Sequence, residues 1–290
     1  MVDATATDIT YQLRPMDNND LESAYQLTQN LHWPHRREDW ATMLKLSHTV
    51  GLEIDGKLVG TACSVVQGQH ASIGLIVVAD EYQGLGLGRR LMEAIMQLAG
   101  QRHLFLTATV AGKPLYEKLG FHVYGRIKQF QGNAKCPTDY PSGSLSNELS
   151  LRQYQTSDHD SIIELMNSAS KMERTKVAEE IFEISEEIVL LEKNNQLQGF
   201  AAFRPFGRGY AIGPVVAQNQ SEATTLIESI LAKYQGRFIR IDTPIQFDLE
   251  PMLLKWNLQQ ADDVTLMSLG PHPYSEQAPY TYSVVTQAIG

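Results

Sequence analysis

The stretch Ser72-Ile-Gly-Leu-Ile-Val-Val-Ala-Asp-Glu-Tyr-Gln-Gly-Leu-Gly-Leu-Gly-Arg-Arg-Leu-Met92 decides the fold. Its first seven residues form an apolar, β-branched run, which is typical of a strand buried on both faces. Beyond the glycines, apolar residues recur at the spacing of one face of an amphipathic helix, at Leu87, Leu91, Ile95 and Leu98. Gly100 is the expected C′ residue of that helix. The stretch therefore predicts a strand, a glycine loop and a helix in succession.

The glycine loop has the composition of an anion-binding site. Gly84, Gly86 and Gly88 stand at alternate positions, where the missing Cβ lets the backbone present successive N–H groups to a ligand. Arg89 and Arg90 follow at the helix start, where each cation costs roughly 0.3–1 kcal/mol unless an anion binds there. We therefore expect a pyrophosphate in the loop, and a plain surface turn is the alternative. The spacing fits neither a P-loop nor a dinucleotide-binding fingerprint.

The motif Gln83-x-x-Gly86-x-Gly88 resembles the acyl-CoA-binding motif of the GNAT superfamily, the Gcn5-related N-acetyltransferases. Residues 115–121, LYEKLGF, are similar to the closing element of that family, and residues 14–27 are similar to its opening strand and helix. The resemblance covers roughly residues 8–132. It implies that acetyl-CoA lies against the strand and the loop, on Ile76, Val77, Val78, Gln83, Gly84, Leu85, Gly86, Leu87, Gly88 and Arg89.

The sequence repeats itself at a constant offset. Residues 53–60, EIDGKLVG, match residues 192–199, EKNNQLQG, and Ile73-Gly74 matches Ile212-Gly213, each 139 positions later. A constant offset over separate segments indicates tandem copies. Both matched segments carry turn residues that tolerate positive φ, Asp55-Gly56 and Asn194-Asn195, so each predicts a β-hairpin.

The second copy lacks the features that the first copy would use. At the same offset Gly86 becomes Thr225, and Tyr116 falls opposite Leu253. Ser221 is a candidate N-cap there, followed by glutamates that suit a helix dipole with no bound anion. We expect an α/β protein of two tandem GNAT-like domains, each a mixed, mostly antiparallel sheet flanked by helices. The predicted parts are residues 1–133, a Pro/Gly/Ser-rich linker at 134–147, and a degenerate domain at 148–290.

Acetyl transfer from a thioester to an amine needs a neutral amine, a stabilised oxyanion and a proton donor for the leaving thiolate. Tyr116 matches the family tyrosine that protonates the thiolate, and a tyrosine packed with its hydroxyl at an edge is the structural alternative. No general base is evident, because Ala71-Ser72 stands where some relatives carry a glutamate and only His70 is near. Thr109 replaces the asparagine that many relatives carry seven residues before the tyrosine.

Residues 31–40, LHWPHRREDW, lie between the first two predicted helices, where the family usually builds its acceptor pocket. Trp33 and His35 are candidate pocket residues, and Asp39 is a candidate ligand of an ammonium group. The alternative is a helix that starts at Pro34, with Asp39 in its first turn and Trp40 in the core. We predict no metal, since no third ligand accompanies the two histidines of this segment.

The composition of the chain disfavours some classes of binding partner. The formal charge of −9 and a pI near 5.4 disfavour a nucleic acid or an anionic membrane as partner. We expect no secretory signal in the first ten residues, and two cysteines without metal-ligand spacing favour a cytoplasmic location. Cys63 raises a rival route through an acyl-cysteine, although it lies in an apolar run where cysteine is usually a small hydrophobe.

These features together favour N-acetyltransferase activity in the first copy, with acetyl-CoA as co-substrate and no metal. The acceptor is predicted to be a primary amine of a small molecule, amino acid or peptide, attacked directly in a ternary complex. The second copy is expected to close the acceptor pocket or to form a homodimer. The alternative from another class is a non-catalytic CoA-binding sensor or scaffold.

Overall fold

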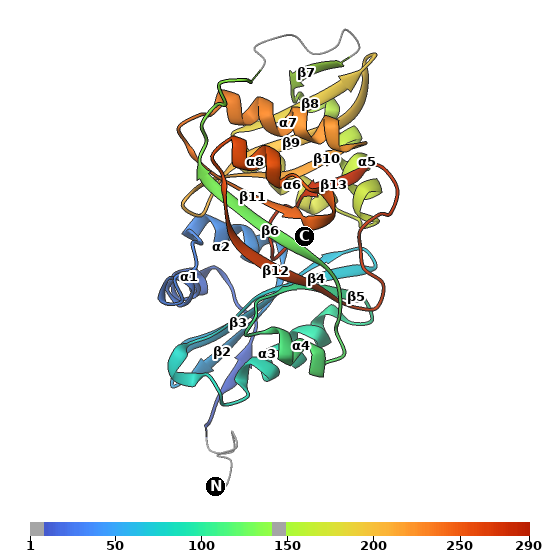
Figure 1. The fold of residues 1–290 in the computed structure, drawn as a ribbon. Coiled ribbons are helices and arrows are strands. Elements are labelled where there is room, and N and C mark those ends of the chain that lie inside the picture. The colour runs from blue at the N-terminus through green and yellow to red at the C-terminus, as the bar shows by residue number, and fades with distance from the viewer. Residues whose placement is uncertain (1–8, 141–148) are drawn as a thin grey trace.

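The computed structural model describes residues 9–140 and 149–290, and the two halves of the chain repeat one order of elements (Figure 1). The first half contains β1 Gln12–Arg14, α1 Leu21–Asn30, α2 Arg37–Leu46, β2 His48–Ile54, β3 Lys57–Gln67, β4 His70–Val78, α3 Leu87–Ala99, β5 His103–Ala108, α4 Lys113–Lys118 and β6 His122–Asn133. The second half contains β7 Leu149–Gln153, α5 His159–Ser170, α6 Thr175–Ile184, β8 Glu187–Lys193, β9 Gln196–Phe206, β10 Gly209–Ala217, α7 Gln220–Lys233, β11 Phe238–Pro244, α8 Glu250–Lys255 and β12 Gln259–Leu269. One further strand, β13 Tyr280–Ser283, follows without a counterpart in the first half of the described chain.

The strands of the described residues form one mixed sheet in the order β1-β2-β3-β4-β5-β12-β6-β11-β10-β9-β8-β7. The halves exchange strands at its centre, because β5 pairs with β12 and β11 pairs with β6. Figure 1 shows β6 and β12 side by side, running between the two halves. The exchange joins the two copies through backbone hydrogen bonds. The predicted domain boundary at 134–147 remains a prediction, and residues 141–147 of that linker lie outside the described residues.

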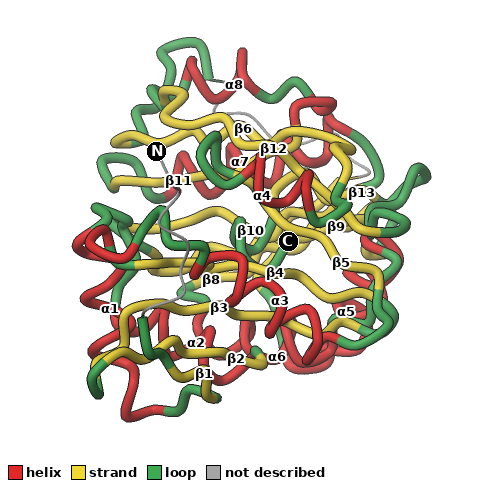
Figure 2. Tube along the Cα trace, turned by 90° about the horizontal axis from the view of Figure 1, so that it is seen from below, coloured by secondary structure: helices red, strands yellow, loops and turns green. Residues whose placement is uncertain are grey.

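Helices cover the sheet on both faces (Figure 2). Apolar residues of α3 pack on β2, β3 and β4 in one core, and α7 packs on β8, β9 and β10 in a second. A third core is shared, because it contains buried residues from α1 and α2 together with residues from α5 and α6. The two halves are therefore joined both by exchanged strands and by a common apolar core.

The structure contains the predicted helix and hairpin turns, but it differs from the prediction at one helix face and at one helix N-cap. The glycine-loop helix exists as α3, and Gly100 follows it with a φ of +69°. The hairpin turns at Asp55-Gly56 and Asn194-Asn195 all have positive φ, as predicted. The helix face was wrong at Leu98, which is 49% exposed, because Met92 and Ala99 complete the buried face instead. The N-cap of α7 was also wrong: Asn219, not Ser221, caps it by accepting the N–H of Glu222.

The repeated sequence positions also form repeated ion pairs. Arg14 binds Asp20 with both terminal nitrogens and donates from Nε to Glu53 at 2.8 Å. Arg152 makes the same contacts with Asp158 and with Glu192 in the second half. Each network ties the first strand of a copy to its first helical turn and to the following hairpin. The copies have thus kept a bidentate guanidinium contact that a lysine could not reproduce.

None of the helices in the described parts of the chain is both long and apolar enough to cross a membrane.

Candidate functional site

The site starts where two parallel strands separate. β4 pairs with β5 only from His70 to Ile73, and the pairing of β4 with β3 shifts register just beyond. Leu75 has a φ of +51° at this irregularity, and its carbonyl accepts a hydrogen bond from the Thr61 hydroxyl at 2.8 Å. A bulge redirects a strand in this way. On the β5 side, the edge of β4 at residues 76–78 consequently has no neighbouring strand from the part of the chain that the structure describes.

The glycine loop at the end of β4 is open. Gly84 and Gly86 have φ of +76° and +77°, and a Cβ added to either would meet no atom within 4 Å. Gly86 is the N-cap of α3 and no side chain caps that end, so the first N–H groups of the helix are available to a ligand. The loop therefore has the shape of an anion cradle. A side chain at either position would strain the backbone, because φ is positive there. A glycine avoids that strain and lets a ligand approach the backbone closely.

Arg89 and Arg90 already pair with a carboxylate of the protein. Both contact Glu93 one turn along α3, Arg89 at 2.8 Å and Arg90 at 3.3 Å. The two guanidinium groups remain more than half exposed. Such surface pairs contribute little stability, so they leave the arginines available to a phosphate.

The cradle, the free strand edge and the predicted catalytic helix meet at Gly88. A Cβ at Gly88 would lie 3.9 Å from Leu115 Cδ2 on α4 and 4.0 Å from Val78 Cγ2 on β4. Tyr116 is buried on α4, and its hydroxyl lies 3.2 Å from the Cβ position of Gly112. Burial raises the pKa of Tyr116 to about 12. The hydroxyl makes no hydrogen bond to any residue that the structure describes.

The equivalent strand edge of the second half is occupied by the chain itself. β13 pairs antiparallel with β10 at Val215, Val216 and Ala217, which lie 139 positions after residues 76–78. The N–H of Val284 then donates to the Asp242 carbonyl on β11 at 3.1 Å. The opening between β10 and β11 is therefore filled from both sides. The sequence showed that the glycines are missing from this copy, but it did not predict that β13 would pair with β10.

A cavity between the halves borders the free edge of β4. The first half contributes Trp33, Pro34, His35, Gly74, Leu75, Thr107, Thr109 and Gln129. The second half contributes Phe206, Arg240, Asp262, Thr286, Gln287 and Ala288. We call it the interdomain cavity. It brings together two of the three predicted acceptor residues and adds charged residues that no local pattern had indicated.

The third predicted acceptor residue lies behind this cavity. The Asp39 carboxylate accepts hydrogen bonds from the Arg36 side chain and backbone, and from the Gly207 N–H of the second half at 3.0 Å. These contacts hold the start of α2 against the β9–β10 turn. Trp40 is fully buried and donates to the Thr28 hydroxyl, which is the core role weighed as the alternative. α2 begins at Arg37 rather than at Pro34.

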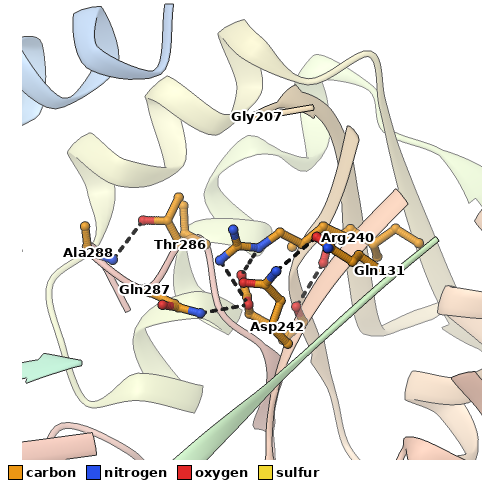
Figure 3. Close-up of polar contacts among 12 residues, drawn as sticks. Gln131, Gly207, Arg240, Asp242, Thr286, Gln287 and Ala288 are labelled. Carbon is orange, nitrogen blue, oxygen red and sulfur yellow. Dashed lines mark hydrogen bonds and ion pairs between the residues drawn. The ribbon is translucent and has the colours of Figure 1, made fainter. Parts of the chain in front are cut away.

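A polar group at the cavity is built by the second half (Figure 3). Arg240 donates to both carboxylate oxygens of Asp242, at 2.8 and 3.1 Å, and Gln287 donates to the same carboxylate at 3.1 Å. The guanidinium carbons of Arg204 and Arg240 lie 4.9 and 5.4 Å from the Phe206 ring centre. Burial lowers the pKa of the nearby His35 to about 4, so its imidazole is neutral at pH 7.

Two residues weighed for chemistry lie elsewhere. His70 is at the closed end of the β4–β5 pair, beside His103 and the backbone of Pro271. The Cys63 thiol is fully buried on β3, and burial raises its pKa to about 12. A thiol in that state supplies almost no nucleophilic thiolate. No cluster of three potential metal ligands occurs in residues 9–140 or 149–290.

Both halves of this duplicated topology match known families. Residues 14–121 match the family described as "Acetyltransferase (GNAT) family", and residues 162–283 match the "Acetyltransferase (GNAT) domain". The chain therefore belongs to the GNAT superfamily and contains two GNAT domains in tandem.

The chain is similar over nearly its whole length to the uncharacterized N-acetyltransferase YitH of Bacillus subtilis (strain 168). The two are 25% identical over 292 residues, 98% of this chain and all of the relative. A putative acetyltransferase from Pyrococcus horikoshii has the same fold, with a TM-score of 0.78 at 19% identity over 97% of this chain and 96% of that one. A tandem GNAT protein from the clavulanic acid biosynthesis pathway superimposes with a TM-score of 0.64 at 13% identity, over 90% and 99% of the two chains.

Proposed function

We propose that this chain transfers an acetyl group from acetyl-CoA to a primary amine, by direct attack of the amine in a ternary complex. The observation that carries the proposal is the open cradle at Gly84 and Gly86, adjacent to a strand edge without a partner. A Cβ at either glycine would project into free space, so these residues leave room for a phosphate group. Backbone N–H groups at the start of α3 would bind it.

Acetyl-CoA supplies an activated thioester, and the chain supplies position and hydrogen bonds. Ala79 donates its N–H to Val59 on the β3 side at 2.8 Å. Successive N–H groups of a strand point to opposite edges, so the Val78 N–H faces the opening, where it would stabilise an oxyanion. Tyr116 would stabilise the departing thiolate from α4. The interdomain cavity would hold the acceptor and, by excluding water, favour its neutral amine.

We also propose that only the first half binds acetyl-CoA. In the second half β13 already pairs with the strand edge that the cofactor would need, and Asn219 caps the equivalent helix. The second half instead contributes residues to the acceptor cavity. A cytoplasmic location and a homodimer remain predictions, and light scattering of the purified chain tests the dimer.

A calorimetric titration with acetyl-CoA tests the proposal, and we expect one site per chain. Gly86→Ala should weaken binding at least tenfold, because its methyl group occupies the cradle. Gly56→Ala is the matched control, since Gly56 also has a positive φ, +74°, and no neighbour within 4 Å of its Cβ position, but lies in the β2–β3 turn. Both variants carry the same backbone strain, roughly 1–2 kcal/mol. Two equivalent sites, or equal weakening by both variants, would contradict the proposal.

Turnover separates an enzyme from a CoA-binding sensor. Release of free thiol from acetyl-CoA in the presence of amines identifies the enzyme. Tight binding without thiol release over a broad amine panel would favour the sensor.

A further inference from the structure

The interdomain cavity is electrically asymmetric. At one end, Arg204 and Arg240 lie over the Phe206 ring, and Arg36 donates to the carbonyl of Pro205. The carboxylates nearby are Asp39 and Asp242. Arg36 pairs with Asp39 and Arg240 with Asp242. Arg204 is fully buried, and among the described residues it donates only to the backbone carbonyls of Gly213 and Val285. This end therefore carries one positive charge in excess.

The charge of Arg204 is poorly compensated where it lies. Its burial lowers the pKa of the guanidinium to about 10, which still leaves it protonated at pH 7. Asp39 and Asp242 act on this charge through space, but neither carboxylate forms a hydrogen bond or ion pair with Arg204 in the described chain. A buried charge without a contacting partner favours a further anion nearby. Arg240 is the guanidinium that reaches the cavity lining. Its Nε and Nη2 atoms bind Asp242, and Nη1 has no acceptor among the described residues.

The other end of the cavity is negative. Asp262 lies on β12, and its Oδ1 accepts the N–H of Asp263 at 2.8 Å. Its second carboxylate oxygen has no donor within the part of the chain that the structure describes. Asp262 is exposed and forms no ion pair with any described residue.

The strand register shows that these two ends face each other across the cavity floor. Asp262 pairs with Gln129 on β6, and Gln129 pairs with Asp242 on β11. Arg240 is two residues before Asp242 and points to the same face. Neighbouring strands are ~4.8 Å apart, so the backbones of Asp262 and Arg240 are separated by roughly 12 Å. Two side chains reaching inward leave a gap of a few ångströms, which suits a small ligand.

The negative end of the cavity lies near Tyr116 and the predicted position of the thioester. β12 pairs with β5 up to Ala108, so Asp262 lies beyond the end of β5, near Thr109. The Thr109 hydroxyl accepts the Gly112 N–H at 3.2 Å, and Gly112 lies under the Tyr116 ring. An amino group held at Asp262 would therefore face the predicted thioester. The cavity has a volume of about 170 Å³.

We propose that the acceptor is a free α-amino acid, bound with its carboxylate against Arg240 and its amino group toward Asp262. Before attack the ammonium releases one proton to solvent. Its nitrogen then forms the amide bond as the carbon–sulfur bond of the thioester breaks, and its second proton passes to the departing thiolate, which leaves as free thiol. This inference rests on the proposed acetyl transfer and names its substrate class. An ammonium and a carboxylate at the two ends of one small molecule complement the two ends of the cavity. An amine without a carboxylate would leave the Arg240 end uncompensated.

The test compares protein α-amino acids with the amine that each yields on decarboxylation, by thiol release from acetyl-CoA. We expect kcat/KM at least tenfold higher for the better amino acids than for their amines. In the double variant Arg240→Gln/Asp242→Asn, which removes both charges and so leaves no unpaired buried carboxylate, this preference should fall roughly 10- to 100-fold. The matched control, Arg237→Gln/Glu186→Gln, removes an ion pair on the surface of the second half and should leave the preference unchanged.

Asp262→Asn should affect both classes of substrate, because an amino acid and the amine that it yields on decarboxylation both carry an amino group. It should lower kcat/KM for amino acids and their amines alike. Thermal unfolding of every variant separates a folding defect from a loss of recognition.

The outcomes distinguish this inference from the proposed function. If the amines are acetylated as well as the amino acids, or better, acetyl transfer stands and the α-amino-acid assignment falls. An equal loss for both classes in the Arg240→Gln/Asp242→Asn variant also overturns it. If acetyl-CoA does not bind at all, the proposed function fails, and calorimetric titration of the chain with amino acids alone decides the inference: charge-dependent binding supports it, and none overturns it.

Discussion

Replacing Tyr116 with phenylalanine separates its chemical role from its packing role. The ring is buried against Phe121 and Gly112, and phenylalanine keeps that packing. The hydroxyl has no hydrogen-bond partner in the described chain, so its removal should change the free energy of unfolding by less than about 1 kcal/mol. Any larger effect on activity would therefore arise from chemistry rather than from folding.

The raised pKa of Tyr116 decides how this residue can assist the leaving thiolate, and hence how much kcat its loss should remove. Burial places the pKa of Tyr116 near 12, whereas an ordinary thiol has a pKa of ~8.5. Complete proton transfer from this phenol to the thiolate would then be uphill by between three and four pKa units, or roughly 5 kcal/mol. We therefore refine the sequence-based expectation: Tyr116 stabilises the thiolate by donating a hydrogen bond as the carbon–sulfur bond breaks. Loss of one such donor lowers kcat roughly 100- to 1,000-fold.

The assay is steady-state thiol release, with calorimetry of acetyl-CoA binding beside it. Tyr116→Phe should lower kcat and leave acetyl-CoA affinity within twofold of the wild type. Tyr124→Phe is the matched control, because the Tyr124 hydroxyl is also enclosed without a hydrogen-bond partner but lies on β6. Undiminished kcat in Tyr116→Phe, or an equal loss in the control, would refute the reasoning.

Two further predictions concern buried groups. Cys63→Ala should keep full transferase activity, because the thiol is buried and its pKa of about 12 leaves no thiolate; loss of turnover with retained fold, or an acyl-enzyme seen by mass spectrometry of the wild type, would restore the covalent route. His35 has a pKa lowered from 6.5 to about 4, so the unfolded chain binds a proton first and stability falls as the pH drops from 6.5 to 4. The cost at pH 5 is about 2 kcal/mol, and His35→Gln should remove that part of the pH dependence in urea unfolding; an unchanged slope between pH 7.5 and pH 5 would show that His35 does not carry it.

The sequence alone determined the features that depend on neighbouring residues. The duplication follows from a constant offset, and the hairpin turns follow from Asp55-Gly56 and Asn194-Asn195, whose positive φ is a local requirement. The strand, glycine loop and α3 follow from residues 72–100 for the same reason. Leu98 shows the limit of periodicity, since the pattern identifies an apolar stripe but not which residue at its edge meets the sheet.

The tertiary structure decided which strands become neighbours and what fills the two clefts. An alternating pattern shows which face of a strand is buried, but its backbone groups can pair with any suitable edge, so nothing in the sequence placed β12 beside β5. The same holds for β13, whose pairing with β10 occupies the strand edge that is equivalent to residues 76–78 of the first half. Arg240 and Asp262 lie far in sequence from Trp33 and Thr109, and only the exchanged strands bring them to one cavity. Local chemistry therefore encoded the predicted cofactor cradle, whereas the proposed acceptor site exists only because the two halves are interleaved.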